Sequence, residues 1–509
     1  MNKKKAANYI QDLGALIALV LLIVVIGAIS PEFRTVGNFL SLLRQSSING
    51  LIAFGMTCVI LTGGIDLSVG SVLALTTALC AGFISGGMPV GLAMILALVI
   101  GTGFGCISGF LVTKGRLQPF IATLITMTVF RGLTMIYMDG KPISNLGDSF
   151  TLKVVGKGNF YHIPIPVILF LLIFVIFLFV LQKTTFGRHI YATGSNAKAA
   201  NLAGVNIDCT KLAAYAISGC MAALSGLILL SRLGSAQPTL GEGYELDAIA
   251  AVALGGTSMN GGRGKIWGTF IGVLIIAVLN NGLNILGVSS YYQDVVKGIV
   301  ILIAVLSDRR DKRGEYGMRM KRFVSVLAAA VMVFGVTGCN AITIDGETEN
   351  VSGEAAGNGS IGFSVSTLNN PFFVTLSEGA KEKAKTEGEK LIVVDAGDDA
   401  AKQTSDIEDL ISKNISVLIV NPVDSDAVAP AVKDAVSRGI KVISVDRGVN
   451  GVDVDCAIAS DNVEGAKMAT EYMVSLLGEN AKVAELEAFP EPVQRSSEEK
   501  DSIWWQIKS

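Results

Sequence analysis

The strongest constraint on this fold is a series of long apolar stretches that fills residues 1–306. A helix needs about 20 apolar residues to cross about 30 Å of hydrocarbon, and many of these stretches approach that length. Charged residues make up only 17% of the chain, below the roughly 25% of soluble domains. The sequence therefore predicts an α-helical polytopic membrane protein with about ten transmembrane helices. The predicted spans are residues 13–30, 46–62, 65–86, 89–112, 118–138, 164–181, 212–232, 246–257, 266–286 and 294–306.

The basic residues of the short loops predict an orientation, because lysine and arginine are retained on the cytoplasmic side. Lys3, Lys4 and Lys5 place the N-terminus inside. Counting spans from there, the inside loops hold most of the remaining basic clusters, although some basic residues also fall in outside loops. The inside clusters are Lys114 with Arg116, Lys183 to Lys211, Arg263 with Lys265, and the run from Arg309 onward.

An export signal is predicted past the middle of the chain. Residues 307–322 contain seven basic and three acidic side chains, followed by an apolar run and a V-T-G-C motif that ends at Cys339. This order is typical of a bacterial lipoprotein signal, so Cys339 is the candidate lipid-attachment residue. An ordinary transmembrane helix is the alternative. In either case we expect a multi-pass protein of the bacterial cytoplasmic membrane, with the residues after 339 on the extracytoplasmic side.

The C-terminal part has a different pattern, in which short β-branched runs alternate with amphipathic helices. Such alternation predicts a parallel α/β sheet. Strands are expected at 360–365, 391–396, 417–420, 441–446, 456–460 and 481–487, and helices at 371–390, 400–413, 424–438 and 462–478. The predicted domains are a membrane domain at 1–312, the signal or transmembrane segment at 313–339, a flexible tether at 340–358, a soluble partial domain at 359–488 and an aberrant, disordered tail at 489–509.

Polar and aromatic residues follow four of the predicted strands. These stretches are STLNNPFF (366–373), NPVDSD (421–426), DR (446–447) and SDN (460–462). Ligands of open parallel sheets bind beyond the carboxyl ends of the strands. Aromatic rings can stack on the apolar face of a sugar while polar groups bind its hydroxyls. Each residue alone could serve as a turn, a helix cap or core packing, but the four strand ends together predict a small-ligand site.

These stretches closely resemble the ribose-type family of periplasmic sugar-binding proteins over about residues 359–488. The resemblance implies that Phe372 and Phe373 stack on the sugar ring and that Ser366, Asn370, Asp446 and Arg447 bind its hydroxyls. It also implies a type I periplasmic-binding-protein fold. Because this family closes two lobes on a ligand and the chain supplies about one, we expect an incomplete lobe with weak or absent sugar binding.

Three stretches of the membrane domain resemble the permease subunit of the same ABC importers. They are LTGGIDLSVGS (61–71), FGRHIYATGSNAKAANLAGV (186–205) and ALGGTSMNGGRGKIWGTFIG (253–272). The resemblance implies a second permease copy, a cytoplasmic ABC ATPase subunit, a sugar-binding protein and a ribose-like monosaccharide as partners. GRGKIW lacks the spacing and the Ser/Thr of a P-loop. We therefore expect a separate ATPase, and neither catalytic residues nor a bound cofactor in this chain.

Two further sets of residues are candidates within the membrane domain. A short surface helix bounded by glycines could transmit ATPase motion, although a plain cytoplasmic loop is the alternative; its residues are Gly187, Tyr191, Gly194, Asn196 and Gly204. Interruptions of apolar sequence are tolerated where protein or a watery cavity shelters them, which predicts close packing or pathway lining for Gly63, Gly64, Asp66, Gly255 and Gly256. Asp66 and Asp247 should avoid lipid.

Composition removes several other function classes. The seven cysteines are scattered singly and there are two histidines, so neither a disulfide framework nor a metal site is indicated. A net charge of −2 carries no nucleic-acid footprint. The leading hypothesis is the permease of an ABC importer for ribose or a related monosaccharide. The alternatives are a membrane-anchored sugar sensor without transport, and a proton-coupled carrier, for which suitable buried carboxylates are few.

Overall fold

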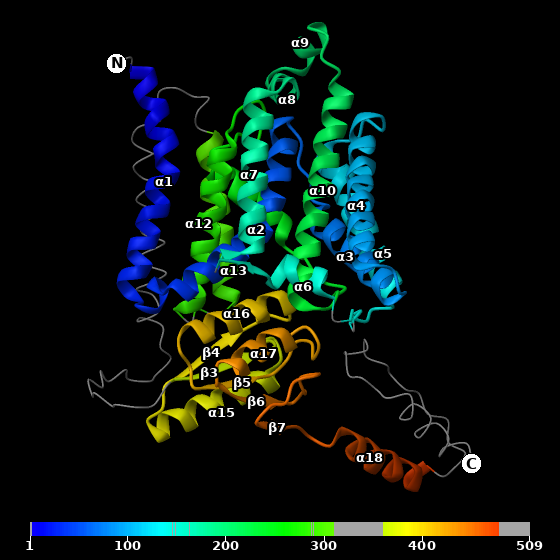
Figure 1. The fold of residues 1–509 in the computed structure, drawn as a ribbon, viewed down its shortest axis with the longest axis vertical. Helices are drawn as coiled ribbons and strands as arrows, with labels where there is room; N and C mark the ends of the chain where they lie inside the picture. The colour runs from blue at the N-terminus through cyan, green and yellow to red at the C-terminus, as the bar shows by residue number, and fades with distance from the viewer. Residues whose placement is uncertain are drawn as a thin grey trace.

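The computed structural model describes residues 3–309, apart from residues 145, 148, 162, 287 and 289, and residues 360–477. The predictions for Cys339, the segment 313–339, the tether 340–358, the strand 481–487 and the tail 489–509 lie outside the described residues. A helical domain forms the upper part of Figure 1, and an α/β lobe lies against its lower end.

Ten helices of the helical domain coincide with the ten predicted spans, which confirms a polytopic helical membrane protein. They are α1 (Lys3–Ile29), α2 (Val36–Leu61), α3 (Val69–Ser85), α4 (Val90–Thr113), α5 (Pro119–Met138), α7 (Ile165–Lys183), α10 (Ile207–Leu233), α11 (Tyr244–Leu254), α12 (Ile266–Ile285) and α13 (Ser290–Arg309). The shorter elements are η1 (Glu32–Arg34), α6 (Phe150–Lys157), β1 (Asn159–Phe160), β2 (Ile163–Pro164), α8 (Thr185–Ser195) and α9 (Ala197–Leu202).

These helices differ in their capacity to cross a membrane. Within the described part of the chain, α4, α5, α7, α10 and α12 are long and apolar enough to do so by themselves. The 11 residues of α11 extend for about 16 Å, roughly half of the hydrocarbon thickness. The eighth predicted span is therefore only a partial crossing, since α11 ends at Leu254 and Gly256 adopts a positive φ of 79°.

Small residues hold the centre of the helical domain together. Helices α4 and α10 approach closely, because a side chain at Gly105 would overlap the carbonyl oxygen of Tyr215 and one at Gly219 would overlap that of Gly101. Such contacts let helix backbones approach closely, as is common between membrane helices. Beside this pair, α2 is buried continuously from Gly50 to Leu61. Thus α2 and α10 form the core of the domain.

The loops predicted to be cytoplasmic gather at one end of the helical domain. In Figure 1 the N-terminal end of α1, α8 and α9 lie at the top, opposite the lobe. At that end the Nζ atom of Lys114, after α4, lies 2.9 Å from a carboxylate oxygen of Asp208, at the start of α10. Ser195 of α8 donates a hydrogen bond to the carbonyl of Gly262. This arrangement agrees with the predicted order of crossings.

The lobe is built on a parallel five-stranded sheet of order β4-β3-β5-β6-β7, which confirms the predicted α/β class. The strands are β3 (Ile361–Val365), β4 (Leu391–Asp395), β5 (Val417–Val420), β6 (Lys441–Val445) and β7 (Cys456–Ile458). The helices are α15 (Pro371–Glu387), α16 (Ala400–Ser412), α17 (Ala429–Ser437) and α18 (Asn462–Leu477). One face of the sheet packs against α15 and the other against α16 and α17.

The start of α17 differs from the prediction, because residues 424–428 form a turn before the helix. The Asp424 carboxylate accepts hydrogen bonds from the backbone N–H groups of Asp426 and Ala427. Pro430 then occupies the first turn of the helix, where its missing N–H has no intrahelical partner. The helix therefore begins at Ala429.

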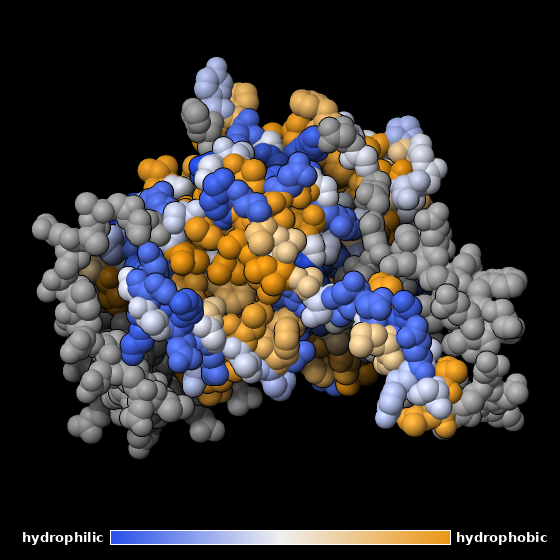
Figure 2. All heavy atoms as spheres, turned by 90° about the horizontal axis from the view of Figure 1, so that it is seen from below, coloured by the Kyte–Doolittle hydropathy of each residue, from blue (hydrophilic) through white to orange (hydrophobic). Residues whose placement is uncertain are grey.

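The lower face of the protein mixes hydrophilic and hydrophobic surface (Figure 2). The last strand of the sheet, β7, has all three residues exposed. Large apolar side chains are also exposed on α18, among them Val463, Met468 and Leu476. This edge contrasts with the opposite side of the lobe, where α16 is buried against the helical domain.

Candidate functional site

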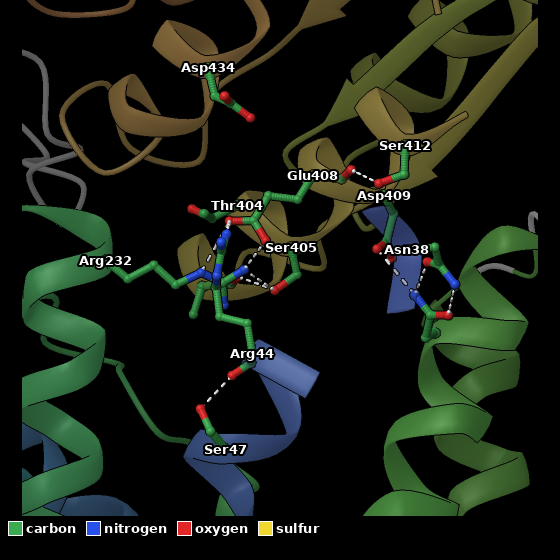
Figure 3. A network of polar contacts seen from close by, with 12 residues as sticks. Asn38, Arg44, Ser47, Arg232, Thr404, Ser405, Glu408, Asp409, Ser412 and Asp434 are labelled. Atoms are coloured by element: carbon green, nitrogen blue, oxygen red, sulfur yellow. Dashed lines mark hydrogen bonds and ion pairs between the residues drawn. The ribbon is translucent and has the colours of Figure 1, made fainter. Parts of the chain in front are cut away.

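A buried ion-pair cluster joins the lobe to the helical domain. Helix α16 lies across the lower ends of α2, α10 and α12 (Figure 1). Arg232, in the last turn of α10, places Nη2 2.8 Å from Oε2 of Glu408 and Nε 3.4 Å from Oε1. Arg44 of α2 approaches the same carboxylate, with Nη1 3.4 Å from Oε1 (Figure 3). The side chains of Arg232 and Glu408 are only 4% and 12% exposed, so two arginines hold one largely buried carboxylate.

Amide side chains of α12 form hydrogen bonds with Asp409, the residue of α16 that follows Glu408. Asn281 donates to Oδ1 of Asp409 at 3.1 Å, and Asn284 donates to Oδ2 at 2.8 Å. Asn281 is itself fixed by reciprocal hydrogen bonds with Asn38 of α2 (Figure 3). Burial raises the pKa of Asp409 to about 7, although the hydrogen bond from Asn284 opposes the shift. The adjacent residues Glu408 and Asp409 thus contact three helices.

A polar cavity of about 150 Å³ lies beside these contacts. Its walls come from α2, α10, α11, α12, α13 and α16, so both the lobe and the helical domain contribute. Asp247 lines it, which agrees with the expectation that this carboxylate avoids lipid, and it accepts a hydrogen bond from Asn49 at 3.4 Å. Across the described residues, no group of three or more His, Cys, Asp or Glu side chains has a metal-binding arrangement.

Three of the predicted sugar-binding residues meet at the carboxyl edge of the lobe's sheet, around Asn421. Ser366 donates to the Asn421 side-chain oxygen at 2.5 Å, and Asn421 donates to Asp446 at 3.4 Å. Arg447 lies 3.9 Å from the Asp446 carboxylate and donates to the carbonyl of Pro422. Asn421 was not among the predicted ligands, although its position directly after a strand was a usable signal. It joins the ends of three strands.

The other three predicted residues have separate environments. The rings of Phe372 and Phe373 lie 5.2 Å apart, edge to face. Phe373 is 5% exposed and packs into the core with Phe363, whereas Phe372 is 56% exposed. Asn370 caps α15 by accepting a hydrogen bond from the backbone N–H of Phe372. Of the two rings, only Phe372 is therefore open to a ligand.

At the opposite end of the protein, α8 packs against two loops of the helical domain. A Cβ at Gly194 would overlap the carbonyl oxygen of Leu61, at the end of α2, and would come within 2.5 Å of the Gly262 nitrogen. The Tyr191 hydroxyl donates to the carbonyl of Gly264, just before α12, at 2.9 Å. Both predicted residues therefore connect α8 to the ends of core helices.

The remaining residues of the predicted coupling segment shape its backbone. A Cβ at Gly187 would overlap the carbonyl oxygen of Leu181. Asn196 separates α8 from α9 and caps α9 by accepting from the N–H of Ala199. Gly204 follows α9 with a φ of +84°, a conformation that glycine adopts without strain. The segment is thus two short consecutive helices, separated at Asn196 and followed by a glycine turn.

Of the five residues predicted to serve packing or translocation, Gly64, Asp66 and Gly255 lie in close packing, whereas Gly63 and Gly256 are exposed. None of the five is among the residues that line the cavity. Asp66 is 1% exposed and accepts hydrogen bonds from Ser68 and from Ser218 of α10, the latter at 2.8 Å. A Cβ at Gly64 would lie 2.6 Å from the Tyr215 hydroxyl oxygen, and one at Gly255 would overlap Gly268 of α12. Gly63 and Gly256 have positive φ angles of 82° and 79°.

Comparison with known proteins shows which protein family the helical domain matches. Residues 38–305 match the family model described as the permease component of branched-chain amino acid transport systems. The chain belongs to this permease family. Three relatives of this permease illustrate the range of similarity. The ribose import permease proteins RbsC of Bacillus subtilis (strain 168) and Escherichia coli (strain K12) are 58% and 48% identical, over 59% of this chain and 93% and 95% of theirs. The L-arabinose transport system permease protein AraH of E. coli (strain K12) is 36% identical over 59% of this chain and 92% of its own.

The lobe matches a different family. Residues 361–500 match the periplasmic binding protein domain. Among solved structures, an ABC transporter solute-binding protein of Mycobacterium smegmatis and the myo-inositol-binding protein of Caulobacter are 38% and 32% identical; each match covers 24% of this chain and 42% of the other, with a TM-score of 0.23. The chain thus spans less than half of these two proteins. The predicted resemblance, an importer permease joined to a periplasmic binding domain, is confirmed.

Proposed function

We propose that this permease carries ribose or a closely related monosaccharide across the bacterial cytoplasmic membrane, as the membrane subunit of an ABC importer. The observation that carries the proposal is the 58% identity to a ribose import permease over 93% of that relative's length. The seating of a periplasmic-binding-protein lobe on one end of the helical domain supports it, because a sugar-binding module there can deliver its ligand to the helices.

The proposal assigns opposite roles to the two ends of the helical domain. The end that carries α8 and α9 faces the cytoplasm and a separate ATPase subunit, which hydrolyses ATP, while this chain binds no cofactor. The end that carries the lobe faces outward, so the residues after 339, with Cys339 as the lipid-attachment site, are extracytoplasmic. A second permease copy completes the transporter.

Three helices can relay motion between these ends. The end of α2 contacts Gly194 at Leu61, and its start contacts Glu408 through Arg44. The segment before α12 contacts Tyr191 at Gly264, and its far end contacts Lys413 through the carbonyl of Ile285. The third, α10, runs from the α8–α9 end to Arg232. Because packed helices move as rigid elements, a shift of α8 driven by ATP would reach the surface that binds α16.

The test is uptake of radiolabelled ribose by inverted and right-side-out vesicles that contain the full chain and an importer ATPase subunit. We expect accumulation in right-side-out vesicles loaded with ATP, whose lumenal face carries α8, but not in inverted vesicles and not with a non-hydrolysable analogue. Uptake that persists without ATP would favour a secondary carrier. Ribose binding without any uptake, in a chain that reaches the membrane, would favour the sugar sensor.

A further inference from the structure

The cavity between the lobe and the helical domain has the lining of a small polar binding site. Its volume of about 150 Å³ corresponds to about five waters at liquid density, and the cavity is partly open, so a larger ligand can extend beyond it. Its lining is unusually rich in amides for a site at the end of a membrane bundle. The amide residues are Gln45, Asn49, Asn280, Asn281, Asn284 and Gln293.

Two of these amides carry a buried polar atom without a partner. Nε2 of Gln45 and Oδ1 of Asn280 make no hydrogen bond to any described residue. In contrast, Asn281 and Asn284 bind Asp409, and Gln293 donates to the carbonyl of Val288. A buried polar atom without a hydrogen-bond partner destabilises a protein. Such atoms at a cavity wall therefore point to a ligand that supplies the missing hydrogen-bond partners.

Asn49 lies beside Gln45 and forms a cluster of three amide side chains with Gln45 and Asn280. It lies one helical turn after Gln45 on α2, so the two side chains share a face of the helix. Its bond to Asp247 is long, at 3.4 Å, and can give way to a better partner. Amides donate and accept hydrogen bonds at once, as hydroxyl groups do. Gln45, Asn49 and Asn280 are therefore suited to a ligand with several hydroxyl groups.

The charges and the ring at the cavity favour a neutral ligand. Four carboxylates and three basic groups line it, so neither an anion nor a cation is strongly preferred; they are Asp247, Asp399, Asp406, Asp409, Arg232, Lys297 and Lys402. Tyr244 adds an aromatic wall. Aromatic and polar side chains together are typical of small-molecule sites.

The predicted ligand edge of the lobe lies beside the end of the helical domain that the lobe covers. The side chain of Gln237, in the loop after α10, lies close to Asp424, three residues after Asn421. Ala400, Ala401 and Ala427 of the lobe belong to the same apolar cluster as the core of the helical domain. The lobe edge around Asn421, which links Ser366 and Asp446, thus lies next to the end of the helical domain that the lobe covers.

We propose that the cavity is a monosaccharide-binding station, in which Gln45, Asn49 and Asn280 bind the hydroxyl groups of a sugar between its release from the lobe and its passage along the helices. The station rests on the proposed function, since it takes the substrate class from it. It is distinct from the edge around Asn421, because its ligand groups come from α2 and α12.

The test is equilibrium binding of radiolabelled D-ribose to the full chain in lipid nanodiscs. Gln45→Met and Asn280→Leu keep the side-chain volume but remove hydrogen bonds, and each is expected to weaken binding about tenfold. The matched control is Gln118→Met, at an exposed position at the start of α5 on the other end of the domain. Thermal unfolding of each variant, unchanged within a few degrees, shows that the fold is retained.

Asp446→Ala, in the lobe, separates the two sites. Binding that is lost in this variant but unchanged in Gln45→Met and Asn280→Leu would place the sugar in the lobe and overturn the station. Absence of ribose binding in the unmodified chain while ATP-dependent uptake persists would overturn the station and leave the proposed function standing. Binding that depends on Gln45 and Asn280 without any uptake would support the station and overturn the proposed function.

Discussion

Replacing Glu408 by glutamine should release the lobe from the helical domain. The Glu408 carboxylate makes three contacts of 2.8–3.4 Å with Arg232 and Arg44. Because the Arg232 side chain is only 4% exposed, loss of the carboxylate leaves a buried guanidinium without its counter-charge. Breaking a buried pair in this way costs about 3–5 kcal/mol. Taking the lower value for the partly exposed Glu408, the ratio of docked to released lobe should fall at least about a hundredfold.

Disulfide cross-linking can measure this ratio directly. A Cβ on Gly37, in the first turn of α2, would lie 3.6 Å from the Ser412 side-chain oxygen of α16, which suits the geometry of a disulfide. The assay uses Gly37→Cys with Ser412→Cys in a background that lacks the exposed Cys209 and Cys456. A protease site inserted within residues 340–358 makes uncross-linked halves separate on a gel. We expect rapid cross-linking in the parent and slow cross-linking in Glu408→Gln.

The control variant is Glu387→Gln, because Glu387 pairs with Lys383 on the exposed surface of α15, and exposed pairs contribute little. Cross-linking of this variant should equal that of the parent. If Glu408→Gln also cross-links within about twofold of the parent rate, the ion pair does not hold the lobe, and the reasoning from burial is refuted.

Three further predictions concern other parts of the protein. Gly194→Val should abolish sugar uptake while the protein still reaches the membrane, because its side chain would overlap the Leu61 carbonyl; Gly103→Ala, where a Cβ meets nothing within 4 Å, should leave uptake unchanged, and normal uptake by Gly194→Val would contradict a role for α8. Burial raises the pKa of Asp409 to about 7, so docking takes up a proton and should weaken as pH rises from about 4 toward 7, by up to about tenfold per unit, then stay constant. Asp409→Asn should reduce this dependence, read at each pH as the ratio of its cross-linking rate to that of the parent, so that thiol ionisation cancels. Asp406, whose pKa burial also raises, to about 6, retains part of the dependence, and a ratio that does not change with pH would argue against the shift. Asp66→Ala should lower the free energy of unfolding by about 1–3 kcal/mol, because Ser68 and Ser218 lose their acceptor; thermal denaturation in detergent measures this, and a melting temperature equal to that of the parent would contradict it.

Much of the fold could be predicted because its signals are local. Apolar length located ten helices, and alternating strands and helices located the sheet, since each depends on residues close in the chain. The departures had long-range causes. The eighth span proved to be the short α11, whose end packs Gly255 on Gly268 of α12. Phe373, adjacent to a true surface residue, turned into the core because α15 packs on β3.

Part of the candidate ligand edge of the lobe could also be predicted, because its signals are local in the chain. Ser366, Asp446 and Arg447 follow strands, so a parallel sheet must bring them to one edge. Asn421 follows a strand as well, but its role as the link between Ser366 and Asp446 appears only once the strand order is known. Residues from α2 and α12 carry no comparable signal, because an isolated amide in a helix does not reveal which other amides it will meet.

The amino-acid sequence by itself determined that this protein is a membrane-spanning helical domain followed by an α/β lobe, because hydrophobic length and periodicity are read over one turn or one strand at a time. Only the tertiary structure decided that Arg44, Arg232 and Asn281 would converge on one face of α16, beside a polar cavity. These residues lie on three helices and pair with a fourth that is more than a hundred residues away in the chain. Their convergence depends on how the helices pack, and no local pattern encodes it.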